Sequence, residues 1–125
     1  MERRFSLTVN EKKQTVVMTM GMLHELSGIV GHVELLPEAT GYNTELRSEM
    51  LVAMLSTRDE EGEIVKELNL RTLDADPDEI LELLAWATGH VTAFLLKAVA
   101  NATKNNEQNV AKLLESTPTN GGSKT

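Results

Sequence analysis

The chain has 125 residues, no cysteine, and a net charge of -7 from 19 acidic and 12 basic side chains. A chain of this length can form one domain with a core of its own, and without cysteine it has no disulfide bond, thiol nucleophile or thiolate metal site. The acidic excess would be repelled by phosphate backbones, so we expect no direct binding to nucleic acid.

The acidic excess is concentrated in one segment. Residues 58–82 hold ten acidic and three basic side chains, which accounts for the whole net charge. This segment is either a solvated turn followed by a helix start, or an acidic patch that steers a basic partner. The N-terminus has no apolar signal-peptide core. We therefore expect a soluble, cytoplasmic protein that has no membrane partner.

Alternating polar and apolar residues predict a β-hairpin near the N-terminus. The alternation covers residues 5–9 and 16–20, on either side of the polar loop Asn10–Lys13. Apolar residues then recur at helical spacing from Met22 up to Gly31. Because a hairpin alone is marginally stable, we expect this helix or a later one to cover its apolar face.

The middle of the chain fits two structures. After a predicted loop with one helical turn over residues 32–43, the apolar residues from Glu45 to Thr57 make a helical stripe, but the continuous run Met50–Leu55 also fits a buried strand. The turn-forming residues 58–63 favour a second hairpin, with its first strand near Met50–Ser56, over a helix.

A long helix is predicted to begin after Asp76. Asp76 can cap it, Pro77 suits its first position, and two acidic residues follow at the positive end of the helix dipole. Fourteen uncharged residues lie between Glu82 and Lys97, with apolar groups on nearly every face, which predicts burial on several sides. Fourteen residues are too few for a bilayer span, which needs about 20. Gly89 indicates a bend or close packing.

The C-terminal part is predicted to contain a short last helix and a tail. Asn105 and Asn106 can cap that helix, and residues 116–125 have almost nothing apolar to bury, so we expect them to be disordered. The predicted fold class is α+β: two β-hairpins each followed by a helix, with a long buried C-terminal helix and a short last helix. Residues 1–115 would form a single domain.

The sequence offers no motif for catalysis, a cofactor or a metal. His24, His32 and His90 are far apart and lie outside the spacings of zinc sites, and His90 is expected to be a hydrogen-bonded interior histidine. Asp74–Asp78 imitates the opening of a calcium loop, but Ala85 stands where the loop needs a bidentate Glu. We therefore expect a protein that is not an enzyme and has no cofactor or metal.

Methionines and aromatic residues are the candidate partner-binding residues. Thioether side chains repack easily and are frequent at surfaces that accept varied apolar partners, although core filling explains them as well. Two aromatic residues eight positions apart share a helix face, as core anchors or as an interface hot spot. The candidates are Met18, Met20, Met22, Met50, Met54, Trp86 and Phe94.

Several short stretches carry a family resemblance. They are Phe5–Asn10, Val16–Gly21, Leu55–Gly62, Leu84–Ala87 with His90, and Phe94–Lys97. Together they resemble the tail assembly chaperones of long-tailed, siphovirus-like bacteriophages, over most of residues 4–104.

The resemblance implies a small non-enzymatic protein that acts in the host cytoplasm. It would bind the long, apolar tape measure protein, keep it soluble, and recruit tail tube subunits, which then displace it. Members of the family are often made in two forms, the longer by ribosomal frameshifting, and the tail after residue 115 would suit a linker to such an extension. The family has no catalytic residues to carry over.

A structural virion protein, an enzyme and a DNA mimic are the alternatives. Hairpins with a covering helix also build rings, so the chain could be a structural virion protein such as a tail tube or connector subunit. An enzyme would need a catalytic constellation, and a DNA mimic would need acidic residues over its surface instead of in one segment. Since the long helix is apolar on nearly every face, we also expect self-association.

Overall fold

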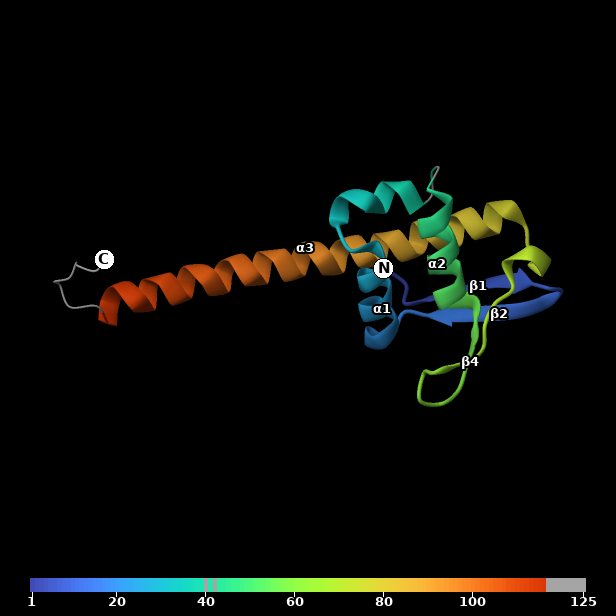
Figure 1. Ribbon diagram of the computed structural model, residues 1–125, viewed down its shortest axis with the longest axis horizontal. Coiled ribbons are helices and arrows are strands. Elements are labelled where there is room, and N and C mark those ends of the chain that lie inside the picture. The colour runs from blue at the N-terminus through green and yellow to red at the C-terminus, as the bar shows by residue number, and fades with distance from the viewer. Residues whose placement is uncertain (40, 42, 117–125) are drawn as a thin grey trace. The chain divides into compact units, whose positions relative to one another are not determined.

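The computed structural model describes residues 1–39, 41 and 43–116 (Figure 1). In this part of the chain the fold is mixed α+β, with two small antiparallel hairpin sheets, three α-helices and two short 3-10 helices. The chain divides into two units, Met1–Phe94 and Leu95–Thr125. Of the predicted disordered tail, residues 117–125 lie outside the described residues.

An N-terminal hairpin is confirmed, but Lys12 and Lys13, predicted in the loop, begin its second strand, and that strand ends at Val17 instead of Met20. Strands β1 (Arg4–Val9) and β2 (Lys12–Val17) are antiparallel, with Val9 opposite Lys12. The connecting turn is only two residues long, and both have positive φ, 51° for Asn10 and 69° for Glu11. Asparagine tolerates this left-handed conformation, which matches the twist of a tight hairpin. Alternation along the strands buries the apolar face of the hairpin.

Helix α1 (Met20–Val30) follows the hairpin directly. The Thr19 hydroxyl caps it by accepting a hydrogen bond of 3.0 Å from the Met22 amide. The helix ends at Gly31, whose φ of 75° suits a glycine. Beyond it, the 3-10 helix η1 (Val33–Ala39) occupies the predicted loop.

The prediction of a strand near Met50–Ser56 is wrong. Helix α2 (Thr44–Leu55) occupies this segment, and the Asn43 side chain caps it by accepting from the Leu46 amide at 3.0 Å. The apolar run is continuous because α2 is enclosed on several sides: it buries Leu46, Met50, Leu51, Ala53, Met54 and Leu55. A buried helix and a buried strand produce the same run of apolar residues, so the cap was the better signal.

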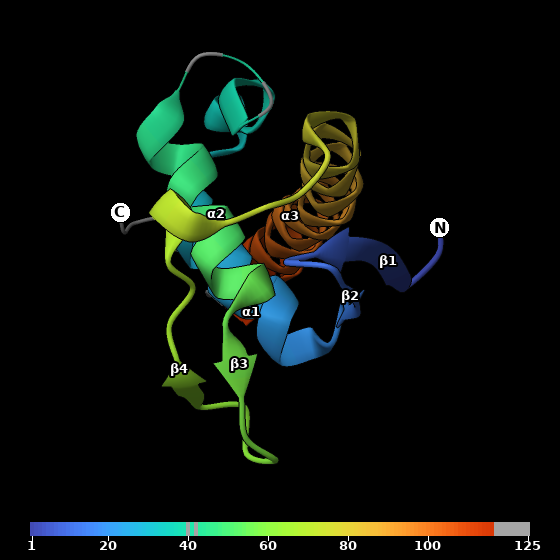
Figure 2. The same ribbon diagram turned by 90° about the vertical axis from the view of Figure 1, so that its right-hand side faces the viewer.

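The second hairpin exists but begins later than predicted. Strands β3 (Thr57–Arg58) and β4 (Ile64–Lys66) are antiparallel, and every β4 residue is exposed. Asp59 shapes the loop by accepting from the amides of Glu61 at 2.9 Å and Glu63 at 3.0 Å. Figure 2 shows this hairpin extending from the end of α2. The 3-10 helix η2 (Leu70–Thr72) follows.

Helix α3 (Pro77–Ser116) begins where it was predicted. The Asp76 carboxylate accepts from the Asp78 amide at 2.9 Å. The separate last helix was a wrong prediction, because α3 runs through Asn105 and Asn106 without a break. An asparagine inside a helix costs only about 0.7 kcal/mol relative to alanine, too little to end it.

The prediction that α3 is buried on several sides is also wrong. Among its described side chains, those that are buried belong to Leu83, Leu84, Ala87 and Val91. Leu83, Ala87 and Val91 follow one another at spacings of four, and Leu84 lies three residues before Ala87, so the four form one stripe. Outside this stripe the helix is more exposed, and Leu81, for example, is 45% exposed. The core of Met1–Phe94 thus combines this stripe with buried side chains of the first hairpin, α1 and α2.

Candidate protein-binding surfaces

The five candidate methionines divide into two groups. Met18, Met50 and Met54 are buried, with 3%, 0% and 4% of their surface exposed. Met20 is 61% exposed and Met22 is half-buried, both in the first turn of α1. The buried three fill the core, and only the α1 pair has surface to offer a partner.

Trp86 and His90 hold the N-terminal segment against α3. The Trp86 indole donates to the Glu2 carbonyl oxygen at 2.8 Å, and His90 Nε2 lies 2.6 Å from the same oxygen. The Trp86 ring also packs on Phe5, with ring centroids 5.6 Å apart, and on His90, at 5.1 Å. Trp86, His90 and Phe94 are all half-buried. Trp86 is therefore occupied by contacts within the chain.

Met1 lies beside Gly89 at a distance that would also accommodate a Cβ atom, so this contact does not require a glycine. A Cβ atom at this position would lie 3.7 Å from Met1 Sδ. The sequence alone pointed to a bend or to close packing at Gly89, and the structure has Met1 beside it. No periodicity links residues so far apart, so sequence reasoning could not name the neighbour.

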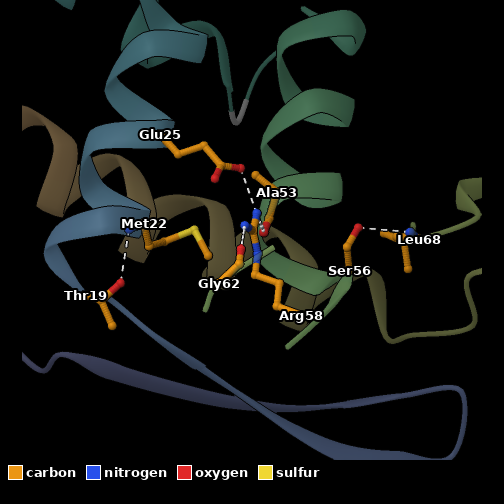
Figure 3. A network of polar contacts seen from close by, with 8 residues as sticks. All are labelled: Thr19, Met22, Glu25, Ala53, Ser56, Arg58, Gly62 and Leu68. Carbon is orange, nitrogen blue, oxygen red and sulfur yellow. Dashed lines mark hydrogen bonds and ion pairs between the residues drawn. The ribbon is translucent and has the colours of Figure 1, made fainter. Parts of the chain in front are cut away.

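Arg58 links three elements that the sequence does not connect. Its Nη2 donates to Glu25 Oε2 of α1 at 2.7 Å and to the Ala53 carbonyl of α2 at 2.8 Å, and its Nη1 donates to the Gly62 carbonyl at 2.7 Å (Figure 3). Figure 3 also shows the Met22 side chain extending from α1 toward Arg58. The second hairpin is thereby tied to α1 and α2.

The stretch Leu55–Gly62, which carries part of the family resemblance, holds the second hairpin in place through its contacts. Besides Arg58 and Asp59, the hydroxyl of buried Ser56 accepts from the Leu68 amide at 2.9 Å (Figure 3). Gly62 has a φ of 86°, which favours glycine. Each of these contacts positions the second hairpin.

Exposed apolar side chains mark surfaces that a partner could cover. Val65 on β4 is 62% exposed, and on α3 Leu96 is 57% and Val99 60% exposed. Leu96 and Val99 are three residues apart and share a helix face. Between Leu95 and Asn109 no described side chain is buried.

The described residues do not form a metal-binding cluster. They contain no group of three or more histidine, aspartate or glutamate side chains that could hold an ion. Asp76 caps α3, and the Asp74 amide donates to Asn10 Oδ1 at 2.8 Å. The apparent calcium loop is a helix start.

By length and composition alone, α3 over Pro77–Asn109 could cross a membrane. In the apolar window of this helix, 22% of the residues are buried. A core helix of a soluble protein can have the same composition but is mostly buried, whereas α3 supplies core residues such as Leu84 over only part of its length. The prediction that the protein has no membrane partner stays a prediction.

Comparison of the chain with models of protein families, with curated proteins and with solved structures gave no match.

Proposed function

We propose that this chain is a tail assembly chaperone of a long-tailed bacteriophage. It binds the tape measure protein in the host cytoplasm, keeps it soluble, and recruits tail tube subunits. The proposal starts from the sequence resemblance and is supported by the kind of surface that the chain exposes.

The observation that carries the proposal is the exposed apolar face of α3 at Leu96 and Val99. Both side chains are more than half exposed, in a stretch where no described side chain is buried. An amphipathic client helix can pack on such a face through apolar contacts that ask little of its sequence. Met20 and Met22 offer a second adaptable contact.

The acidic loop of the second hairpin would speed the binding of a client. Its carboxylates are exposed and would attract lysines and arginines of a client, which raises the association rate more than the affinity. Salt screens this attraction over about 8 Å at physiological ionic strength. The on-rate should therefore fall with salt more steeply than the affinity does. The carboxylates belong to Asp59, Glu60, Glu61 and Glu63.

The test is co-expression with a tape measure fragment. The fragment should be soluble with this chain and insoluble without it. The pair Leu96→Asp and Val99→Asp should weaken binding roughly tenfold or more, because apolar hot spots typically contribute about 2 kcal/mol. The matched control is Asn101→Asp with Thr103→Asp, which adds the same charge at exposed positions of the same helix.

Solubility that does not depend on the chain would contradict the chaperone proposal. The alternative is then a structural virion protein such as a tail tube or connector subunit. One observation favours it: the second hairpin sheet has only two strands, and β4, whose three residues are exposed, could pair along its outer edge with another copy. Regular rings or tubes of the purified chain in electron micrographs would identify that alternative.

Self-association is part of the chaperone proposal. The exposed face at Leu96 and Val99 can pack on the same face of a second copy when no client is present. Light scattering should give a mass that rises with concentration and falls when the client fragment is added. A strict monomer at high concentration would contradict this part of the proposal.

A further inference from the structure

A cavity open to solvent lies between the tip of the first hairpin, the end of α2 and the segment that follows β4. Its volume is about 470 Å³, within the range of ligand pockets. Buried Leu55 and half-buried Leu68 give it an apolar wall. Gln14, also in the lining, donates to the Leu55 carbonyl oxygen at 3.3 Å and fixes β2 to the end of α2.

All three lysines of the unit Met1–Phe94 line this one cavity. They are Lys12, Lys13 and Lys66, and each is exposed. Among the described residues, no hydrogen bond or ion pair engages any of their ammonium groups. The lining contains a single carboxylate, that of Glu67. A chain with a net charge of -7 thus carries a local positive excess at this cavity.

The walls of the cavity are held in place by contacts outside it. The Leu68 amide donates to Ser56 Oγ at 2.9 Å, which fixes the segment after β4. At the hairpin tip, the Asn10 amide donates to the Asp74 carbonyl oxygen at 2.7 Å, and Asn10 Oδ1 accepts from the Asp74 amide. A ligand would therefore meet a preformed cavity, which lowers the ordering cost of binding.

We propose that this cavity binds a short acidic segment of a partner polypeptide. Carboxylates of that segment would pair with Lys12, Lys13 and Lys66, and one apolar side chain would pack against Leu55 and Leu68. The proposal is independent of the tail-chaperone function and of the apolar face on α3.

The chemistry of the lining favours carboxylates on a peptide over a nucleic acid. No arginine is among the described lining residues, so the bidentate fork that favours phosphate is missing. A long phosphate backbone would also be repelled by the ten acidic side chains of residues 58–82. A short peptide with two or three carboxylates avoids most of that repulsion.

The test is a fluorescence anisotropy titration of the full chain. The probe is a dye-labelled heptapeptide of alternating glutamate and leucine. Lys12→Glu with Lys66→Glu should raise its Kd at least about tenfold, and the glutamine versions of the two substitutions should give a smaller increase. Lys97→Glu with Lys104→Glu is the matched control, with the same charge change at exposed positions of α3, and should change Kd less than about twofold.

A second measurement places the peptide on the cavity. Acetylation of lysines by a water-soluble reagent, followed by mass spectrometry, should show protection of Lys12, Lys13 and Lys66 by the peptide and none of Lys97. Circular dichroism of the variants should match the parent chain, since the substituted side chains are exposed.

Several results would overturn the proposal. They are no binding of the glutamate peptide, an equal loss of binding in the control variant, and equal binding of a peptide with glutamine in place of glutamate. A hexathymidylate that competes as well as the peptide would identify a phosphate site in place of a carboxylate site.

Discussion

Helix α3 carries large apolar side chains in two regions that differ in burial. Within Met1–Phe94 it supplies Leu83, Leu84, Ala87 and Val91, all with 0% exposure, to the core. After Leu95 no described side chain is buried, although Leu96 and Val99 are as apolar as the core residues. The comparison teaches that an apolar sequence sets what a helix can bury, while its neighbours decide what it does bury.

The largest expected effect on stability comes from comparing the same substitution, leucine to alanine, in the two regions of α3. Leu84→Ala should lower the free energy of unfolding by about 3 kcal/mol, because it leaves a cavity in a packed core. Leu96→Ala should change it by less than about 0.5 kcal/mol, since its side chain is 57% exposed. Urea denaturation of both variants measures the difference. Equal losses would mean that Leu96 is buried in solution, as in a stable oligomer.

Trp86→Ala should lower the free energy of unfolding by about 2 kcal/mol. This is less than the 3 to 5 kcal/mol typical of a fully buried aromatic residue, because Trp86 is half-buried. Trp86→Phe keeps an aromatic ring but loses the hydrogen bond to the Glu2 carbonyl, which should lower the free energy of unfolding by about 1 kcal/mol. Denaturation followed by circular dichroism compares the two. A midpoint that does not move in Trp86→Ala would indicate that the N-terminal segment is not held on α3.

Arg58→Lys should lower the free energy of unfolding by about 1.5 kcal/mol. A lysine cannot contact Glu25 Oε2 and the carbonyl oxygens of Ala53 and Gly62 at the same time. Amide hydrogen exchange should accelerate most in β3 and β4. Arg71→Lys, at an exposed arginine without these contacts, is the control. Uniform acceleration throughout Met1–Phe94 would show that Arg58 supports the whole core and not the hairpin.

Removal of residues 95–125 should have the smallest effect on stability, less than about 0.5 kcal/mol, because no described side chain in that range is buried. The shortened chain should nevertheless lose the binding of the tape measure fragment. Thermal melts and the co-expression assay measure the two properties separately. A large fall in melting temperature would mean that this region supports the core.

Local signals in the sequence determined the first hairpin and the start of α3. Alternation over β1 and β2 and the cap at Asp76 act within a few residues, so they can be read without the rest of the chain. The same applies to the absence of cysteine and the acidic segment 58–82.

Only the tertiary structure decided which apolar residues are buried and which partners distant residues meet. Met50 and Met54 are buried while Met20 is 61% exposed, although the sequence made all three equal candidates for partner binding. Trp86 finds its acceptor at Glu2, and Arg58 finds Glu25, across long separations in the chain. Three lysines meet at one cavity for the same reason. Such partners depend on which segments pack together, and periodicity along the sequence carries no information about that choice.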